Sequence, residues 1–212
     1  MADVAKLQEE FETLVRSNIK REGIEDLLTY LEESTFYIEP ASTRYHGCYA
    51  GGLVEHSINV YYCLINYLQY LYGAEWEKAF SLETATIVSL FHDLCKINRY
   101  KESTRNVKDP STGQWNTINT YIYNPDYNPM GHGSLSVFKI QQYIKLTEDE
   151  IGAIYWHMGS FDIGNYNTVG DLGNHMQKHI LTYALHTADM EATYIVENPN
   201  FVPIPIETER NG

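Results

Sequence analysis

A histidine and an aspartate stand side by side inside an apolar run, and this pair constrains the fold more than any other feature. The run is IVSLFHDLCK at residues 87–96, and its apolar spacing predicts that it belongs to a helix over residues 82–96. A carboxylate inside a buried helix is costly unless something pairs with it. A metal ion is the simplest shared partner for His92 and Asp93.

Two further polar residues pose the same problem in other apolar segments. His56 lies in GGLVEHSINV at 51–60, and Asp189 lies in LTYALHTADMEATYI at 181–195. Each of these residues taken alone is more often satisfied within a core than bound to a metal. Four unpaired groups on three apolar helices would each cost about 1–3 kcal/mol. Their convergence on one cation would remove all four penalties, so the sequence predicts a metal site built from separate helices.

The remaining apolar periodicity predicts a mostly helical chain. Helices are expected over residues 3–17, 23–33, 53–72, 82–96, 133–145, 148–158 and 175–196. Thr147 and Glu150 have the spacing of a capping box at the start of one of them. Residues 35–52 and the Gly- and Asn-rich stretch 159–174 are expected to be loops. The Pro-broken tail is expected to lie extended on the surface.

Residues 98–130 have a different character and predict a β-hairpin inserted between helices. NTINTYIY at 116–123 alternates as strands do, and DPSTG at 109–113 is a turn signal. The expected fold class is therefore all-α with an inserted β-hairpin. A length of 212 residues suits one domain. Its parts would be N-terminal helices at 1–34, a core at 40–195 and a tail at 197–212.

The charge of the chain narrows its partners. The formal net charge of -13 would repel a long polyanion, so duplex nucleic acid is excluded as a partner. A small anion held by a metal ion is compatible with this charge, because a bound cation dominates its local field. A cationic strip follows the His-Asp pair and consists of Lys96, Arg99, Lys101, Arg105 and Lys108. It either receives a compact anion or forms a solvated hairpin face.

Cysteine usage and hydropathy indicate the compartment. Cys48, Cys63 and Cys95 are odd in number and have no CxxC spacing, so neither a disulfide framework nor a zinc ribbon is indicated. The first residues have no apolar signal-peptide core, and no segment approaches the roughly 18 apolar residues of a membrane span. The expected location is the cytoplasm, without membrane association.

The order H…HD…D on separate helices resembles the HD superfamily of metal-dependent phosphohydrolases. HGCYAGGLVEHS at 46–57 is similar to the segment before the first ligand in the HD domain of bacterial 3′–5′ exoribonuclease-like hydrolases. FHDLCK at 91–96 resembles the HDxGK segment of the family, and MGHGSLS at 130–136 matches a later Gly-His element. The resemblance covers residues 40–195, with 98–130 as an insertion. Cys95 departs from the pattern, which usually has Gly there.

The resemblance implies an HD-type helical bundle and a role for each matching residue. His56, His92, Asp93 and Asp189 would hold a first metal. His132 and His157 would hold a second metal, with Asp93 bridging the two ions. Asp93 and Lys96 would be catalytic. The expected contacts of the substrate phosphate are Lys96, Arg99, Arg44 and His46, although Arg44 and His46 could equally be a surface-loop pair. A homodimer is expected, because HD proteins commonly pair through helices.

The ligand set indicates hydrolysis. Imidazole and carboxylate ligands suit one or two divalent ions, which could be Mn, Fe, Co, Ni, Zn or Mg. Such ions can lower the pKa of a bound water toward about 7 and generate a nucleophile. The predicted function is hydrolysis of a phosphate ester in a small nucleotide or related phosphorylated metabolite. Two alternatives stay open. One is a 3′–5′ exonuclease or phosphodiesterase acting on single strands, and the other is a non-catalytic nucleotide-sensing module.

Several other side chains receive less specific interpretations. His186 lies three positions before Asp189 and is expected to orient it or to pack beside the site. His175 and His179 are expected to be structural or exposed. Four tyrosines fall in the insertion and either form a base-stacking wall or pack the hairpin onto the helices: Tyr100, Tyr121, Tyr123 and Tyr127.

Overall fold

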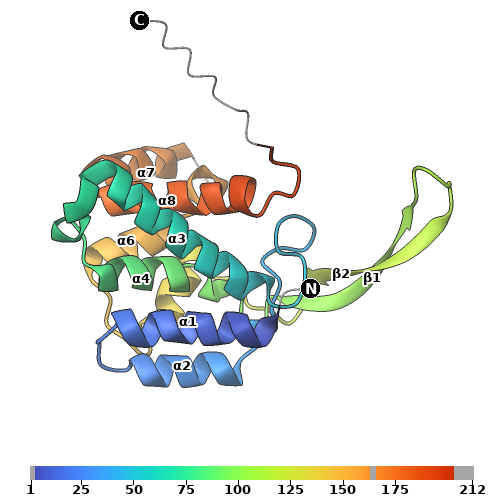
Figure 1. Cartoon of the computed structure of the whole chain (residues 1–212), viewed down its shortest axis with the longest axis horizontal. Coiled ribbons are helices and arrows are strands. Elements are labelled where there is room, and N and C mark those ends of the chain that lie inside the picture. Colours follow the sequence, from blue (N-terminus) through green and yellow to red (C-terminus); the bar gives the residue numbers. More distant parts are fainter. Residues whose placement is uncertain (1–2, 163–165, 203–212) are drawn as a thin grey trace, which may run out of the picture.

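Helices make up most of the described chain, and one long hairpin projects from them (Figure 1). The computed structural model describes residues 3–162 and 166–202. The α-helices are α1 Val4–Asn18, α2 Ile24–Glu33, α3 Gly52–Tyr72, α4 Leu82–Phe91, α5 His132–Ile140, α6 Glu148–Trp156, α7 Tyr166–Lys178 and α8 Ile180–Glu191. Short helical turns are η1 Phe36–Ile38, η2 Gly73–Lys78, η3 Leu94–Lys96, η4 Gly159–Asp162 and the π-helical η5 Ala192–Val196. The expected all-α character with one hairpin is confirmed.

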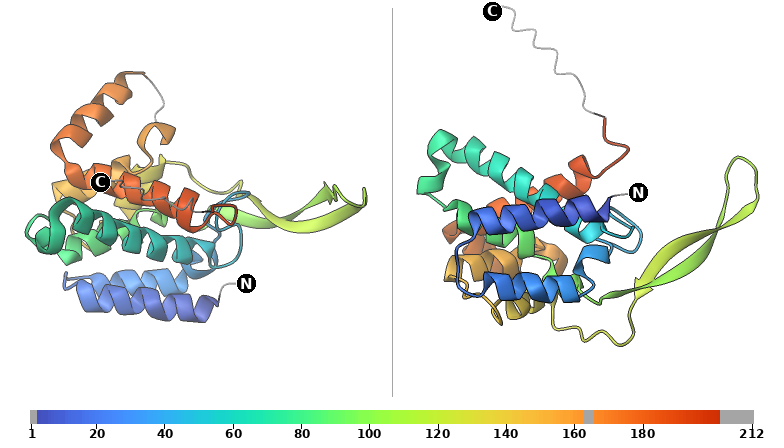
Figure 2. Two further views of the ribbon diagram at one scale, coloured as in Figure 1. Left: turned by 45° about the horizontal axis from the view of Figure 1, so that its top comes forward. Right: turned by 60° about the horizontal axis from the view of Figure 1, so that its bottom comes forward.

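The helices are stacked in layers that place the core around α4. Figure 1 shows α1 and α2 on one side of α4 and α6, with α3 and α8 on the other side. The left view of Figure 2 shows the same separation of α1 and α2 from α8. Phe11 from α1 packs against Phe36 and Phe91, with ring centroids 5.1 and 5.9 Å away. The end of α4 is therefore fixed deep in the molecule, where the His-Asp pair follows.

The predicted continuous helix over 82–96 is wrong beyond Phe91. α4 ends there, Asp93 adopts φ -106° and ψ 17°, and η3 resumes as a short 3₁₀ turn. Adjacent side chains on an α-helix point in different directions around its axis. The break allows both side chains to turn toward the same point.

Two other expectations about the second half of the chain are also wrong. Most of the stretch predicted as a loop over 159–174 is helical: η4 opens it, and α7 begins at Tyr166. The predicted helix over 175–196 is interrupted at His179, whose φ of -125° and ψ of 87° separate α7 from α8. His179 lies 2.6 Å from Asp149, so a contact with α6 accompanies the break.

The hairpin follows the predicted pattern. β1 Tyr100–Lys108 pairs antiparallel with β2 Trp115–Tyr123, in a register that runs from Tyr100 opposite Tyr123 to Lys108 opposite Trp115. Most of its residues are exposed on both faces, and Trp115 is 69% exposed. Its base is tied to the bundle, since Thr120 donates to the Thr43 carbonyl at 3.2 Å. The rest of the hairpin projects from the helical body (Figure 2).

The sequence predicts that no segment of the chain crosses a membrane, and the helices can be compared with that prediction. None of the described helices combines the length and apolar character needed to cross a membrane.

Candidate metal centre

The four residues expected to hold a first metal meet in space. His56 comes from α3, the His92-Asp93 pair follows α4, and Asp189 comes from α8. His56 Nε2 lies 3.2 Å from Asp189 Oδ1 and 3.8 Å from Asp93 Oδ2. His92 Nε2 lies 3.4 Å from the same Asp93 oxygen. Residues up to 133 positions apart in sequence thus present their side chains to one point.

Two further histidines approach the other oxygen of Asp93. His132, the first residue of α5, places Nε2 2.6 Å from Asp93 Oδ1. His157, directly after α6, places Nε2 3.5 Å from the same oxygen. The carboxylate of Asp93 therefore stands between two pairs of imidazoles. Buried His and Asp groups in this cluster could hold a metal ion.

Two of the imidazoles have an unused nitrogen that faces the carboxylates. His92 Nδ1 donates to the Ser89 carbonyl at 2.7 Å, and His157 Nδ1 donates to the Ile154 carbonyl at 2.6 Å. A carbonyl only accepts, so Nδ1 carries the hydrogen and Nε2 of the neutral ring has a free lone pair. Both rings are fully buried, and neither Nε2 has a hydrogen-bond partner within the described residues. Such an orphaned lone pair beside a carboxylate requires a proton or a cation.

The sequence interpretation missed Glu197, which orients His56. His56 Nδ1 donates to Glu197 Oε1 at 2.9 Å, and Asn59 Nδ2 donates to the same oxygen at 3.0 Å. Burial lowers the pKa of His56, but Glu197 and Asp189 outweigh burial and raise this pKa to about 10. A carboxylate behind an imidazole fixes the ring and makes its other nitrogen a better ligand. Glu197 was expected to lie on the surface, whereas its side chain is 8% exposed.

Lys96 supplies positive charge directly at the cluster. Its Nζ lies 2.6 Å from Asp93 Oδ2, and both side chains are buried. Burial raises the pKa of Asp93, but Lys96, His92 and His132 outweigh burial and hold this pKa well below its usual range. Burial likewise lowers the pKa of Lys96, and the attraction of Asp93 outweighs it and raises the pKa. The pair is therefore an ammonium and a carboxylate at neutral pH.

Arg99 changes the role expected for His132. Arg99 Nη1 lies 3.1 Å from His132 Nδ1, and a guanidinium can only donate. His132 Nδ1 therefore accepts, which leaves the hydrogen on Nε2, where it is donated to Asp93. This tautomer has no lone pair on Nε2. In this arrangement His132 is a hydrogen-bond donor to Asp93, and binding of a second metal by Nε2 would require Arg99 to release it.

An inner cavity of about 270 Å³ opens onto the cluster. The charged groups that line it are Asp93, Asp189, Lys96 and Arg99. Two of the four insertion tyrosines, Tyr100 and Tyr123, line it as well. Tyr127 instead donates its hydroxyl to the Cys95 carbonyl at 2.5 Å, which packs the insertion against η3. The insertion thus contributes both a wall of the cavity and a structural anchor.

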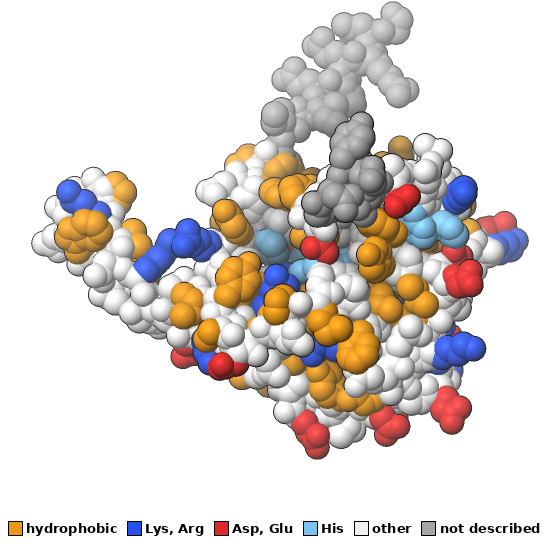
Figure 3. Space-filling model, turned by 180° about the vertical axis from the view of Figure 1, so that it is seen from behind, with side chains coloured by type: hydrophobic (Ala, Val, Ile, Leu, Met, Phe, Trp, Pro, Cys, Tyr) orange, Lys and Arg blue, Asp and Glu red, His pale blue; other side chains and the backbone are white. Residues whose placement is uncertain are grey.

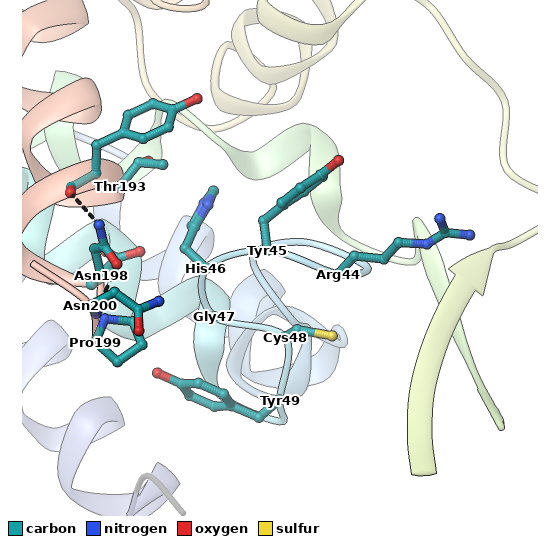
Figure 4. Close-up of a pocket in the computed structure, with 12 residues that line it drawn as sticks. Arg44, Tyr45, His46, Gly47, Cys48, Tyr49, Thr193, Asn198, Pro199 and Asn200 are labelled. Carbon is teal, nitrogen blue, oxygen red and sulfur yellow. Dashed lines mark hydrogen bonds between the residues drawn. The ribbon is translucent and has the colours of Figure 1, made fainter. Parts of the chain in front are cut away.

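His46 and Arg44, the two loop residues expected to contact phosphate, lie at different cavities. The ring of His46 lies 5.0 Å from that of His56, and His46 lines the inner cavity. Its Nε2 is buried without a partner among the described residues. Arg44 is exposed and lines a neighbouring outer cavity instead (Figure 4). The structure therefore brings His46 to the cluster and leaves Arg44 at a distance.

The remaining histidines support the structure around the site. His186 Nδ1 donates to the His157 carbonyl at 2.6 Å, so it packs behind His157 and does not orient Asp189. His175 Nε2 lies 3.0 Å from Thr182 Oγ1, and His179 pairs with Asp149. The structural role expected for His175 and His179 is confirmed.

Comparison with known proteins identified no relative of this chain. No family model matches the chain, and no curated protein or solved structure matches it either. The candidate metal centre therefore rests on the arrangement of its own side chains.

Proposed function

We propose that this chain is an HD-type metal-dependent phosphohydrolase that cleaves a phosphate ester in a small nucleotide or related metabolite. One observation carries the proposal. His92 and His157 are fully buried, and each presents an unpartnered Nε2 toward the carboxylates. Nδ1 of each ring is already committed to a backbone carbonyl. This is how a histidine is prepared for a metal ion, with one nitrogen anchored and the other free.

The donor set fits a divalent cation of the first transition row or Mg²⁺. His56, His92, Asp93 and Asp189 offer two nitrogens and two carboxylates within reach of one another. Cys95 lies near Asp93 and His132, but burial raises the pKa of its thiol to about 12. A thiol that keeps its proton is a poor ligand. Nitrogen and oxygen ligands without thiolate suit Mn, Fe, Co, Ni, Zn and Mg.

The residues around the cluster suit a compact phosphate. A bound divalent ion would polarise a phosphoryl oxygen and lower the pKa of water. Lys96 and Arg99 both line the inner cavity and stay protonated at neutral pH. Their donors can hold the phosphoryl oxygens in a fixed orientation and offset their negative charge. Asp93 positions the ammonium of Lys96 for this contact.

The activity can be tested directly on the purified protein. It should be stripped of metal, reloaded with Mn²⁺, Co²⁺, Ni²⁺ or Mg²⁺, and supplied with nucleotides, aryl phosphate mono- and diesters, and a labelled single-stranded oligonucleotide. We expect metal-dependent turnover of a small ester. The turnover of an Asp93→Asn variant should be more than about a hundredfold lower. Mutation of residues that only hydrogen-bond to metal ligands already lowers affinity or activity by about 10–100-fold. Absence of turnover with every metal, in protein shown by elemental analysis to be loaded, would refute the proposal.

A matched control separates loss of the site from general damage. His179→Ala removes an imidazole that pairs with Asp149 away from the cluster. This variant should retain the turnover of the unsubstituted protein. Cleavage of the oligonucleotide in preference to the small esters would instead favour a nuclease acting on single strands.

A further inference from the structure

The hairpin of β1 and β2 lies apart from the helices that form the core. Its strands pair over nine successive residues with no bulge, and both views of Figure 2 show it projecting from the helical body. Trp115 is 69% exposed and Ile122 is 51% exposed, although their side chains lie on opposite faces of the strand. A two-stranded hairpin without a covered face is only marginally stable in water. A further contact would therefore stabilise this hairpin.

The outer edge of each strand has free backbone groups. Within the part of the chain that the structure describes, no backbone hydrogen bond joins residues 100–108 or 115–123 to a third segment. The N–H and C=O groups on such an edge are a template for another strand. Strand addition would cover an edge and extend the sheet at the same time.

The two edges differ in their protection against strand addition. Charged side chains are a common protection, and β1 has four of them: Lys101, Glu102, Arg105 and Lys108. The sequence of β2, WNTINTYIY, has no charged residue, no proline and no glycine. Apart from its two asparagines, β2 consists of β-branched and aromatic residues, which favour strands. The edge of β2 is therefore the one open to a further strand.

The strand that matches β2 best is β2 of a second copy. A two-fold axis through Asn119, the central residue, pairs all nine residues of one β2 with those of the other in antiparallel fashion. Trp115 then lies opposite Tyr123 of the second copy, and Thr117 lies opposite Tyr121 of the second copy. Aromatic and β-branched residues form favourable cross-strand pairs, and no like charges meet.

The distribution of charge also favours contact through the hairpins. The net charge of the chain is -13, so two copies repel each other on average. Within the hairpin the basic residues outnumber the acidic ones, with Lys101, Arg105 and Lys108 against Glu102 and Asp109. Antiparallel pairing also places the two helical bodies at opposite ends of the shared sheet. A nine-residue strand spans about 30 Å, which exceeds the Debye length of about 8 Å at physiological salt.

We propose that two copies of this chain associate through β2 and form one antiparallel four-stranded sheet. The order of its strands is β1 and β2 of one copy, followed by β2 and β1 of the other. This interface differs from the helix pairing that the HD resemblance implies. It does not depend on the proposed function, because none of its strand pairs involves the metal centre.

The association can be measured by sedimentation of the full chain from about 1 µM to about 1 mM, which covers weak to moderate affinities. The mass should rise from 24.5 kDa toward twice that value. Asn119→Lys places two ammonium groups opposite each other at the two-fold axis and should weaken association by about tenfold or more. Thr104→Lys is the matched control, since exposed Thr104 lies opposite Asn119 within the hairpin but on the β1 edge. The control should associate as the unsubstituted protein does.

A charge-swap experiment separates a defect in pairing from a defect in folding. Asn119→Glu alone should also associate weakly, because two carboxylates meet at the axis. An equimolar mixture of Asn119→Lys and Asn119→Glu should regain association, since opposite charges then face each other. The proposal is overturned if the unsubstituted protein stays monomeric up to about 1 mM, or if the mixture does not regain association. Dimers that Asn119→Lys leaves intact would also overturn it and would favour pairing through the helices.

Discussion

Two buried polar clusters lie in the same helical bundle. We call a cluster closed when all its buried side-chain polar atoms have hydrogen-bond partners among the described residues, and open when some do not. Only one of the two is closed. In the first, Arg21 pairs with Glu150 through two contacts of 2.7 and 3.0 Å. The Glu150 carboxylate also accepts from Thr84 Oγ1 at 2.9 Å and from the Thr147 amide at 2.8 Å. Each of its oxygens therefore has two donors. In the second cluster, around Asp93, two imidazole nitrogens have no partner among the described residues.

This difference separates a structural cluster from one prepared for a ligand. A buried acid does not by itself imply a metal, because Arg21 can satisfy Glu150 completely. Asp93 is paired as well, with Lys96 and His132. The lone pairs left over on His92 and His157 could each take up a proton or a cation. Figure 3, a view from behind, shows that some histidine side chains reach the surface among hydrophobic ones, whereas His92 and His157 are fully buried.

The largest effect should come from breaking the closed cluster. Glu150→Ala leaves the Arg21 guanidinium without its main partner, and breaking a buried ion pair costs about 3–5 kcal/mol of unfolding free energy. Urea denaturation should show this loss equally with a divalent metal and with a chelator. Glu148→Ala, which removes an exposed carboxylate from the same helix turn, is the control. A loss that depends on metal would mean that the two clusters are not independent.

In contrast, the unfolding free energy contributed by the open cluster should depend on metal. A divalent ion at about one hundred times its dissociation constant should raise the unfolding free energy by about 2.7 kcal/mol. His92→Ala should abolish most of this increment, whereas Glu150→Ala should keep it despite its lower stability. Thermal unfolding with and without metal measures both. An undiminished increment in the His92 variant would place the bound ion elsewhere.

A smaller effect is expected from Glu197, which contacts the open cluster only through His56. Glu197→Ala removes the acceptor of His56 Nδ1 and should weaken metal binding by about 10–100-fold. Glu197→Gln retains an acceptor oxygen and should lose less. Calorimetric titration of metal into both variants tests this, with Glu32→Gln on the exposed face of α2 as the charge-matched control. Equal affinities in all four proteins would rule out a positioning role for Glu197.

A separate effect concerns a third buried acid that belongs to neither cluster. Burial raises the pKa of Glu39 from 4.5 to about 7, although a hydrogen bond from Thr35 opposes the shift. Between these values the folded protein holds a proton that the unfolded chain has released. Its stabilising contribution is thus complete below pH 4.5 and is lost as pH rises through about 7. The two pKa values correspond to a loss of at most about 3 kcal/mol.

Urea denaturation at a series of pH values measures this loss. Glu39→Gln should flatten the profile over that window and leave metal binding intact. A profile as steep as that of the unsubstituted protein would mean that another group is responsible.

Local patterns in the sequence predict much of the fold. Apolar periodicity predicts α1, α2 and α3 within about one residue of their ends, and the expected capping box of Thr147 and Glu150 is present at α6. Alternation and a turn signal predict the hairpin. The requirement that buried polar groups find partners correctly predicts that His56, His92, Asp93 and Asp189 meet. These features depend on the spacing of nearby residues or on polar residues within apolar segments, and both can be read directly from the sequence.

Features set by contacts between distant segments were not predictable. The end of α4 at Phe91 has no Gly or Pro to announce it. Glu197 meets His56 across 141 positions, and no spacing rule links them. The bond from Arg99 that sets the tautomer of His132 depends on how the hairpin leaves η3. The sequence shows that these residues are polar, but it does not show which atom each one faces.

The candidate ligands come from four separate stretches of the fold, near α3, α4, α6 and α8, and this has a consequence for dynamics. A cation bound there would link all four segments and would favour every state in which they remain packed together. Its binding energy would therefore slow amide hydrogen exchange throughout those helices together, while the exposed hairpin would exchange at an unchanged rate.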